Sequence, residues 1–434
     1  MTTKNIVQSL KNIFKGDVTI WMIFFLLCVI SITEVYSSSS ILGYKSGNYW
    51  YAAAYHTFLL GLGVVAMVFV LNVPCRYFKI MTPIMVPFSW LILFLVYIVG
   101  TKANDAARWL VIFGIPLQPS EVAKGTMVLA VAHILSSLQT PEGAGPKAFK
   151  YVCLTAASLI VPVFPENFST AALMGIVVVV MMIIGRVSMR KIGYLMSAVV
   201  LVAALAITLV FTMGKSNDQL AGDAAAQNRQ YTEVVEGKAV KEEVKTPKRG
   251  GLLHRLDLWK GRITNHFAKE DVPADSFDLD KDGQVGHANI AIASCNFFGV
   301  GPGNSVQRDF LPLAFSDFIY AIIFEEFGWL GAAFVALLYI SLLFRTGYIA
   351  RQCENAFPAY LAMGLAMMIV IQALFNMMVA VGLAPVTGQP LPLISKGGTS
   401  SIINCIYIGV ILSVSRTAKK KGEPKKLNDG AARA

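Results

Sequence analysis

Charged residues are scarce in this chain, and its cysteines are few and scattered. Asp, Glu, Lys and Arg make up 15% of the 434 residues, whereas an ordinary soluble domain has about 25%. Together with a hydrophobic share of 55%, this balance argues against a soluble enzyme and against a disordered chain. The six cysteines form no CxxC pair and no Cys/His cluster, so the sequence contains neither a zinc motif nor a disulfide framework.

The chain contains many long apolar runs. A helix needs about 20 mostly apolar residues to cross a bilayer. Ten runs meet or approach this length, at 18–37, 51–72, 81–99, 119–138, 149–164, 168–185, 192–212, 317–343, 357–381 and 398–415. The first is too long for a signal peptide and no small-residue cleavage site follows it, so we expect it to be retained. The sequence predicts an all-α polytopic membrane protein with about ten transmembrane helices.

The net charge of +11 comes from cations that are distributed unevenly between the two predicted sides of the membrane. A basic protein can bind nucleic acid, but this requires cations clustered on a soluble face. Outside the long connection 213–316, most Lys and Arg lie in the two termini and in the loops on the same side of the membrane as the termini. Because cytoplasmic loops are enriched in these residues, we expect the N-terminal segment 1–17 and the basic tail 416–434 to be cytoplasmic. No nucleic-acid partner is predicted.

One connection, residues 213–316, is much longer than the others and separates the spans of 18–212 from those of 317–415. We expect it to be extracytoplasmic. Its first part, 215–249, mixes both charges with few large apolar residues, so it should be mobile. The remainder is richer in Leu, Phe and Ile and is expected to pack on the membrane domain.

Two stretches of this loop begin like known motifs. Residues 278–283 read D-x-D-x-D-G, as in a calcium loop, but Asn289 stands where the bidentate Glu belongs, so calcium binding is not favoured. Residues 299–305 are rich in glycine without forming G-x-G-x-x-G, and they follow no strand–helix unit. We expect a tight loop there.

Polar residues gather at the predicted outer ends of three spans. A central charge costs on the order of 2.5–3.5 kcal/mol on the insertion scale, so such residues indicate function or pairing. The set comprises Gln118, Ser120, Glu121 and Lys124 in the fourth span, Asp317, Glu325 and Glu326 in the eighth, and Lys396 before the tenth. Structural roles are open as well. The helix dipole favours an acid in the first turn, Glu121 and Lys124 can pair at i and i+3, and Ser120 can cap a helix.

These residues resemble the signatures of the SEDS family, the FtsW, RodA and SpoVE group of peptidoglycan polymerases. Residues 108–124 are similar to R-W…Q-P-S-E-x-x-K, and 311–328 to L-P-E…T-D-F-I-F-A…E-E-x-G. Residues 395–400 resemble S-x-G-G-S-S, and 299–305 correspond to G-x-G-x-G-x-S. The four motifs occur in order over residues 15–416, which makes the resemblance specific.

The chain departs from the family pattern at three positions. Asn167 stands where the Asp of E-P-D-x-G-T is usual, Leu313 replaces the Glu of L-P-E, and Phe315 replaces a frequent His. We carry no role over to residues 165–170 or to Leu313. Arg108, Lys124, Glu325 and Asp317 match the pattern.

The resemblance implies glycosyl transfer at the outer face of the cytoplasmic (inner) membrane, with lipid II as the building block. The sugar of lipid II is α-linked to a diphosphate and the polymer is β-1,4-linked, so each addition inverts the anomeric centre. A single displacement requires a base for the acceptor hydroxyl and positive charge for the departing diphosphate. It requires no covalent nucleophile, and the sequence contains no Ser/His/Asp or Cys/His constellation.

We therefore expect Asp317 to be the general base. Arg108, Lys124 and Lys396, in this order, are the candidate cations for the diphosphate. Gln118 and Ser120 are further candidates for substrate binding, and Glu121, Glu325 and Glu326 for support. One hypothesis is that Glu325 holds Lys124 or Arg108 in position. A divalent cation, Mg²⁺ or Mn²⁺, could share the work on the diphosphate, although the sequence offers no dedicated metal site.

The resemblance also implies partners, namely the nascent glycan strand, a class B penicillin-binding protein transpeptidase, and other proteins of the divisome or elongasome. The chain length and the 411–416 ending favour a role in cell division over a RodA-like role in elongation. Two other classes stay open. A lipid-precursor flippase should carry polar residues across the midplane, where only Gln372 and Asn376 occur. A non-catalytic scaffold for a transpeptidase would not need Asp317.

Overall fold

The computed structural model describes residues 15–38, 49–103, 106–112, 115–213, 260–261, 264, 279–311 and 316–418. The stretch 215–249, predicted to be mobile, and the basic tail from residue 419 onward lie outside these residues, as do Leu313 and Phe315. The chain divides into two compact units. The first comprises 1–189, 280–383 and 387–434, and the second comprises 190–279 and 384–386. The predicted boundaries of the membrane blocks and the long loop stay predictions.

Each of the ten predicted runs corresponds to a helix. These are α2 (Val18–Ser38), α4 (Tyr49–Asn72), α5 (Cys75–Val99), α6 (Pro119–Ser137), α7 (Ala148–Val163), α8 (Phe168–Ile184), α9 (Met189–Met213), α13 (Ile319–Gln352), α14 (Ala356–Ala380) and α15 (Thr399–Thr417). Within the described residues, seven of them are long and apolar enough to cross a membrane, and α7 and α8 are shorter apolar helices. The helical, polytopic membrane class is confirmed, whereas the count of ten spans stays a prediction.

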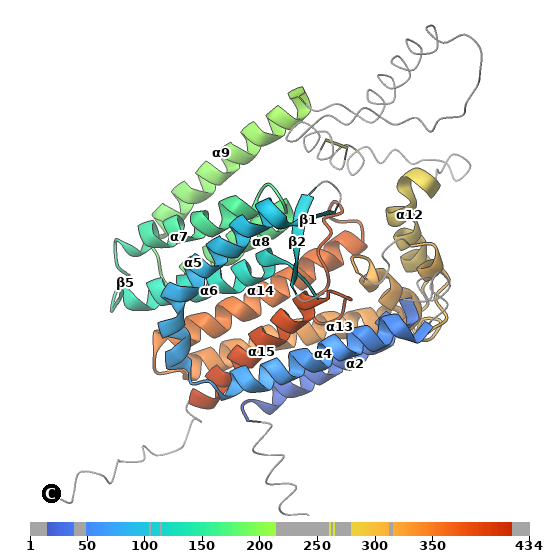
Figure 1. Cartoon of the computed structure of the whole chain (residues 1–434), viewed down its shortest axis with the longest axis horizontal. Coiled ribbons are helices and arrows are strands. Elements are labelled where there is room, and N and C mark those ends of the chain that lie inside the picture. Colours follow the sequence, from blue (N-terminus) through green and yellow to red (C-terminus); the bar gives the residue numbers. More distant parts are fainter. Residues whose placement is uncertain are drawn as a thin grey trace, which may run out of the picture. The chain divides into compact units, whose positions relative to one another are not determined.

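The core of the first unit is built around α14 and α15. Their apolar windows are 72% and 78% buried, against 28% for α5, whose remaining apolar side chains face outward. Such a face requires an apolar solvent, which is what a bilayer provides. Within this unit α15 packs along α4, α13 along α14, and α6 between α5 and α14 (Figure 1).

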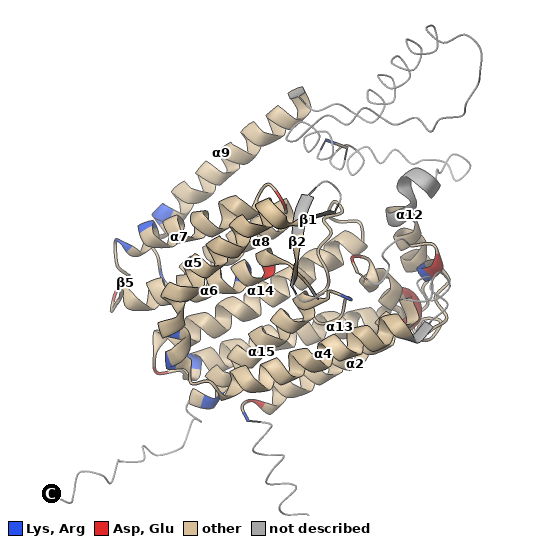
Figure 2. Cartoon of the chain, viewed as in Figure 1, with Lys and Arg blue, Asp and Glu red and all other residues tan. Residues whose placement is uncertain are grey.

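Cations of the first unit gather at one end of its helices (Figure 2). Arg76 and Lys79 lie in the first turns of α5, and Arg416 lies in the last turn of α15, where its Nη1 donates to the Leu71 carbonyl at 2.9 Å. Near the end of α13, Arg345 binds the Asp17 carboxylate at 2.6 Å. The arrangement agrees with the predicted cytoplasmic end, and the orientation itself stays a prediction.

A short antiparallel sheet joins α5 to α6. Strand β2 (Ala106–Ile112) pairs with β1 (Thr101–Ala103) on one side and with β3 (Ile115–Leu117) on the other, with Leu110 opposite Leu117. A two-stranded hairpin, β4 (Gln139–Thr140) and β5 (Gly143–Ala144), follows α6. The sequence did not predict these strands, because β1 and β3 have three residues each and the seven residues of β2 do not alternate between apolar and polar.

Helix α13 differs from its predicted form. It begins at Ile319, so Asp317 lies in the turn before the helix and not in its first turn. The helix is also broken at Gly328, which has φ 67° and ψ −169°. A Cβ at this position would lie 2.4 Å from the carbonyl oxygens of Asn296 and Phe297, so only glycine fits without displacing the backbone.

The loop after α12 (Leu279–Ala293) restores the hydrogen bonds that the break in α13 removes. The N–H groups of Val300 and Gly301 donate to the carbonyls of Glu325 and Glu326 at 3.0 and 2.9 Å, and Leu330 N–H donates to the Phe297 carbonyl at 3.3 Å. The 299–305 stretch is therefore a tight loop bound to the broken helix. Residues 279–283 of the calcium-like stretch are the start of α12, so they do not form a metal-binding loop.

Candidate functional site

The start of α6 places a lysine and a glutamate inside the protein. Lys124 is fully buried, and its Nζ lies 2.8 Å from Glu121 Oε1 and donates to Gln372 Oε1 of α14 at 2.6 Å. The predicted i, i+3 pair between Glu121 and Lys124 is confirmed. Tyr407 of α15 donates to the Glu121 carbonyl at 2.6 Å, so three helices converge on this pair.

Asp317 lies half-buried in the turn before α13. The Ser316 hydroxyl donates to Asp317 Oδ1 at 3.0 Å, and the Asp317 backbone carbonyl accepts from Asn376 Nδ2 of α14 at 2.8 Å. Gly388 lies beside the carboxylate, since a Cβ built at this glycine would lie 3.6 Å from Asp317 Oδ2. The side of the carboxylate facing residue 388 is therefore kept clear of side-chain bulk.

Two buried amides of α14 connect Lys124 with Asp317. Gln372 holds Lys124 and Asn376 holds the Asp317 carbonyl, and residues four apart lie on one face of a helix. The sequence reading noted both amides only as polar residues near the midplane. Their i, i+4 spacing in an otherwise apolar helix was the signal that could have placed them in the site.

The segment of residues 388–398 lies against the same amides. Gln372 Nε2 donates to the Pro390 carbonyl at 3.0 Å, and Asn376 Nδ2 donates to the Gln389 carbonyl at 2.8 Å. Ser395 donates to the Ser316 carbonyl at 2.6 Å, which ties the segment to the turn that carries Asp317. Lys396 is half-buried in this segment, and burial lowers the pKa of its ammonium group.

Gln118 and Ser120 lie at the opposite edge of this region. Gln118 is the N-cap of α6 but its side chain makes no capping hydrogen bond, and Ser120 is buried in the first turn of the helix. Together with Glu166 and Asn167 they line a cavity of about 20 Å³. This volume admits a water molecule but not a sugar. Asn167, which departs from the family pattern, caps α8 by accepting from Thr170 N–H at 3.1 Å.

Arg108 lies in β2, and the structure describes its backbone only. The pairing of β2 with β3 brings the strand beside the start of α6, since β3 ends at Leu117 and α6 begins at Pro119. The role of the Arg108 guanidinium stays a prediction.

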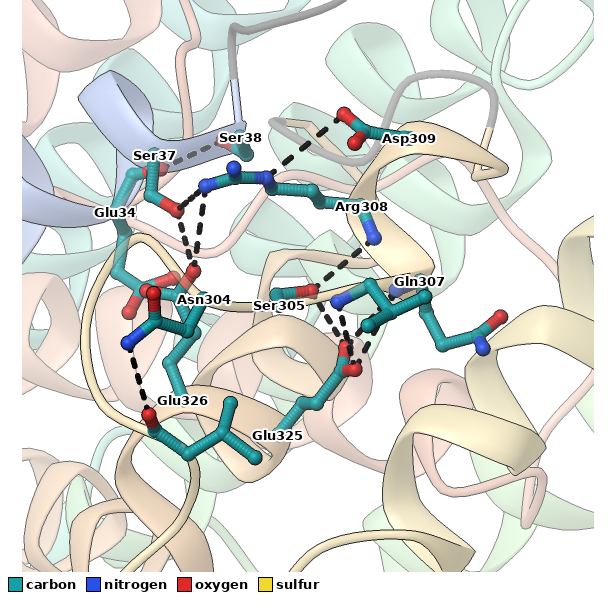
Figure 3. A network of polar contacts seen from close by, with 12 residues as sticks. Glu34, Ser37, Ser38, Asn304, Ser305, Gln307, Arg308, Asp309, Glu325 and Glu326 are labelled. Carbon is teal, nitrogen blue, oxygen red and sulfur yellow. Dashed lines mark hydrogen bonds and ion pairs between the residues drawn. The ribbon is translucent and has the colours of Figure 1, made fainter.

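Of the two partners expected for Glu325, Lys124 is wrong, and the side chain of Arg108 lies outside the described structure. The Glu325 carboxylate accepts from the Ser305 hydroxyl, from Val306 N–H at 2.9 Å and from Gln307 N–H at 3.3 Å (Figure 3). Lys124 is held by Glu121 and Gln372 instead. Glu325 thus supports the loop that leads toward Asp317, through the short helix η2 (Gln307–Asp309).

Glu326 supports the same loop from the next position of α13. Its Oε1 accepts from the Ser37 hydroxyl of α2 and lies 4.0 Å from Arg308 Nη1 (Figure 3). In the part of the chain that the structure describes, no group of three or more His, Cys, Asp or Glu side chains could hold a metal ion. A divalent cation on the diphosphate stays a prediction.

Comparison with known proteins gives a consistent result. A family model for FtsW, RodA and SpoVE, described as "Cell cycle protein", matches residues 17–221 and 252–420. The chain is 28% identical over 409 residues to a "Probable peptidoglycan glycosyltransferase FtsW" of Halomonas elongata, covering 92% of this chain and 90% of the relative.

Solved structures share the fold. One, described as "Structural coordination of polymerization and crosslinking by a peptidoglycan synthase complex", matches with a TM-score of 0.65 at 20% identity, over 93% of this chain and 98% of the other. The rod shape determining protein RodA of Thermus thermophilus matches with a TM-score of 0.61 at 19% identity, over 94% of this chain and 100% of RodA. The chain belongs to the FtsW/RodA/SpoVE family of multi-pass membrane proteins.

Proposed function

We propose that this protein is a peptidoglycan glycosyltransferase, which polymerises lipid II into β-1,4 glycan strands at the outer face of the cytoplasmic membrane. One arrangement carries the proposal. The two amides of α14 and segment 388–398, which includes Lys396, connect Asp317 with the Lys124–Glu121 pair. The name of the Halomonas elongata relative supports the same activity.

The proposed reaction is a single displacement at the anomeric carbon. The acceptor 4-hydroxyl loses its proton to the Asp317 carboxylate while its oxygen forms a bond to C1 of the donor sugar. The bond between C1 and the diphosphate oxygen breaks on the opposite side, and the diphosphate leaves with the bonding pair. Inversion at C1 converts the α-linked donor into a β-linked product.

Asp317 is suited to this role because its backbone is fixed while its carboxylate is only half-buried. Asn376 holds the carbonyl, and Ser316 donates to one carboxylate oxygen. Residue 388 is a glycine, so it contributes no side-chain atom beside the other oxygen. A base must reach the proton that it removes within hydrogen-bond distance, which a fixed turn with an accessible carboxylate allows.

The three candidate cations have different surroundings. Lys124 is enclosed and bound to Glu121 and Gln372, so we assign it a positioning role through these side chains. Lys396 is half-buried beside the turn of Asp317 and is the candidate for charge on the departing diphosphate. We retain Arg108 as a second candidate because of its place beside α6.

The polar residues near the midplane favour an enzyme over a flippase. Gln372 and Asn376 are buried and bonded to Lys124, Asp317 and segment 388–398. The N–H groups of both amides donate to backbone carbonyls of the site, and the Gln372 oxygen accepts from Lys124. A transport path would instead need such groups to face a passage through the membrane.

The direct test is polymerisation of labelled lipid II by the purified full chain, alone and with a partner transpeptidase. We expect glycan ladders from the wild type and from Glu142→Gln, which alters an exposed carboxylate, and none from a folded Asp317→Asn. Ladders from Asp317→Asn would remove this residue from the mechanism. Absence of product from the wild type, even with the partner, would contradict the proposed activity and favour the flippase or scaffold class.

A further inference from the structure

A second set of buried charges lies where α2, α13 and η2 meet (Figure 3). Glu34 and Ser37 come from α2, Glu326 from α13 and Arg308 from η2. The side chains of Glu34 and Glu326 have no exposed surface. No catalytic or binding role proposed above requires Glu34, and the sequence did not single out this acid near the end of an apolar run.

Glu326 is the member of this set whose charge is compensated. Its Oε1 accepts from the Ser37 hydroxyl, which in turn accepts from Arg308 Nη1 at 2.8 Å. The same guanidinium nitrogen lies 4.0 Å from Glu326 Oε1.

Glu34 has no such support. Within the described part of the chain, neither of its carboxyl oxygens has a hydrogen-bond donor, and Glu326 Oε2 also lacks one. Glu34 extends from α2 toward Glu326, and the two carboxyl groups interact electrostatically (Figure 3). The charge of Arg308 is shared with Glu326 and with Asp309, whose Oδ1 lies 3.8 Å from Arg308 Nε.

The charges around Glu34 do not balance if both buried acids are ionised. Among the described residues, η2 contributes Arg308 and Asp309, and α13 contributes Glu326 and, one residue earlier, Glu325. On α4, the titratable group His56 is bound to Ser31, one turn from Glu34 on α2. Two buried carboxylates would thus share one guanidinium, and an uncompensated buried carboxylate binds a proton instead of staying charged.

We propose that Glu34 and Glu326 form a proton-sharing carboxyl pair, in which Glu34 carries the proton and Glu326 is the ionised partner held by Ser37 and Arg308. A protonated Glu34 gains an O–H donor, which can point at Glu326 Oε2. This single bond satisfies an oxygen of each residue that otherwise has no partner. Paired carboxyl groups that hold one proton between them are a known solution to this geometry.

The pair acts as a proton-dependent lock on the loop in front of Asp317. Arg308 and Ser305 belong to the stretch that ends, a few residues later, at the turn of Asp317. If Glu34 loses its proton, two negative charges repel in a buried space, and Arg308 cannot neutralise both. The contact of α2 with α13 and η2 is then weakened. The consequence for catalysis rests on the proposed function, whereas the protonation of the pair does not.

The test compares Glu34→Gln with the wild type as full chains in lipid nanodiscs, by thermal unfolding between acidic and alkaline pH. The folded wild type retains a proton that the unfolded chain releases at lower pH, so its unfolding temperature should fall as the pH rises between these two ionisations. Glutamine mimics the neutral acid. The Glu34→Gln variant should match or exceed the wild type at neutral pH and lose this part of the pH dependence.

Glu325→Gln is the matched control one position before Glu326. The Glu325 carboxylate already accepts from three donors, so the loss of its charge should lower the unfolding temperature at every pH. Infrared spectroscopy gives a direct readout. The C=O stretch of a buried protonated carboxyl should be present in the wild type and in Glu325→Gln at neutral pH, and absent from Glu34→Gln.

Three results would overturn the lock. A Glu34→Gln variant as destabilised as Glu325→Gln, with the carboxylic acid band unchanged, would mean that Glu34 is ionised. Stabilisation of the wild type but not of Glu34→Gln by Na⁺, Mg²⁺ or Mn²⁺ would mean that a metal ion occupies the place of the proton. If lipid II polymerisation falls at the same alkaline pH in the wild type and in Glu34→Gln, the carboxyl pair has no link to catalysis. A wild type that is inactive at every pH would contradict the proposed function and leave the protonation of the pair unaffected.

Discussion

At the scale of single residues, Lys124 shows how a buried charge is kept in a membrane protein. Its ammonium group is bound by one carboxylate and one amide, and nothing of its side chain is exposed. A buried pair of this kind adds little net stability, but removing one member leaves the other charge without compensation. Because both members of the ion pair belong to α6, it is the hydrogen bond from Lys124 to Gln372 that joins α6 to α14.

We expect Lys124→Met to destabilise the protein by about 3–5 kcal/mol, because it leaves the Glu121 carboxylate buried and unpaired. The double variant Lys124→Met/Glu121→Gln should recover much of this loss. Denaturant or thermal unfolding in detergent measures both effects, with Lys150→Met as the control for an exposed lysine. A double variant no more stable than Lys124→Met would show that the pair is not the source of the loss.

At the scale of secondary-structure elements, the break in α13 matters most for the site. The loop of residues 296–301 supplies the backbone hydrogen bonds that the helix lacks at Gly328. This loop continues into Ser305 and η2, which the Glu325 carboxylate binds. The helix break, the loop and η2 thus form one connected structure, which precedes the turn of Asp317 by a few residues in the sequence.

We expect Gly328→Ala to disturb this structure. A side chain at φ 67° and ψ −169° costs about 1–3 kcal/mol, and the added Cβ would also displace the Asn296 and Phe297 carbonyls. Polymerisation should fall more steeply than stability, because the loop leads to the turn of Asp317. Gly175→Ala in α8 is the control, since a Cβ there meets no atom within 4 Å and alanine favours a helix. Equal activity of the two variants would contradict the link from loop to site.

The helices and strands also show how much of the fold can be predicted from the sequence. The ten runs were located because a long apolar stretch has only one stable form in lipid, the helix. The strands β1–β3 and the break at Gly328 were not predicted. Short strands lack a clear alternation, and a glycine inside a helical pattern does not by itself reveal a break when the bonds that repair it come from a loop about 30 residues earlier in the chain.

At the scale of the whole molecule, the proposed activity calls for a partner that crosslinks the strands. The fold is shared with a structure described as a peptidoglycan synthase complex that coordinates polymerization and crosslinking. We propose a class B transpeptidase as the partner of this chain and cell division as its setting, in line with the name of the Halomonas elongata relative.

We expect a tagged full chain to concentrate at division sites and to co-purify with a class B transpeptidase. Localisation depends on surfaces and not on the reaction, so Asp317→Asn should localise as the wild type does. This variant separates recruitment from catalysis. A uniform signal along the lateral wall would contradict the division role and favour elongation.

The sequence by itself determined the membrane class, the helical segments and the order of the family motifs, because hydrophobicity and local spacing are properties of contiguous residues. Only the tertiary structure decided which side chains meet. Lys124 binds Gln372 of α14 and not Glu325, and Glu34 faces Glu326 across almost 300 positions. The reason is physical: lateral packing selects among several helices of similar hydrophobicity, and a buried charge finds its partner only after that choice is made.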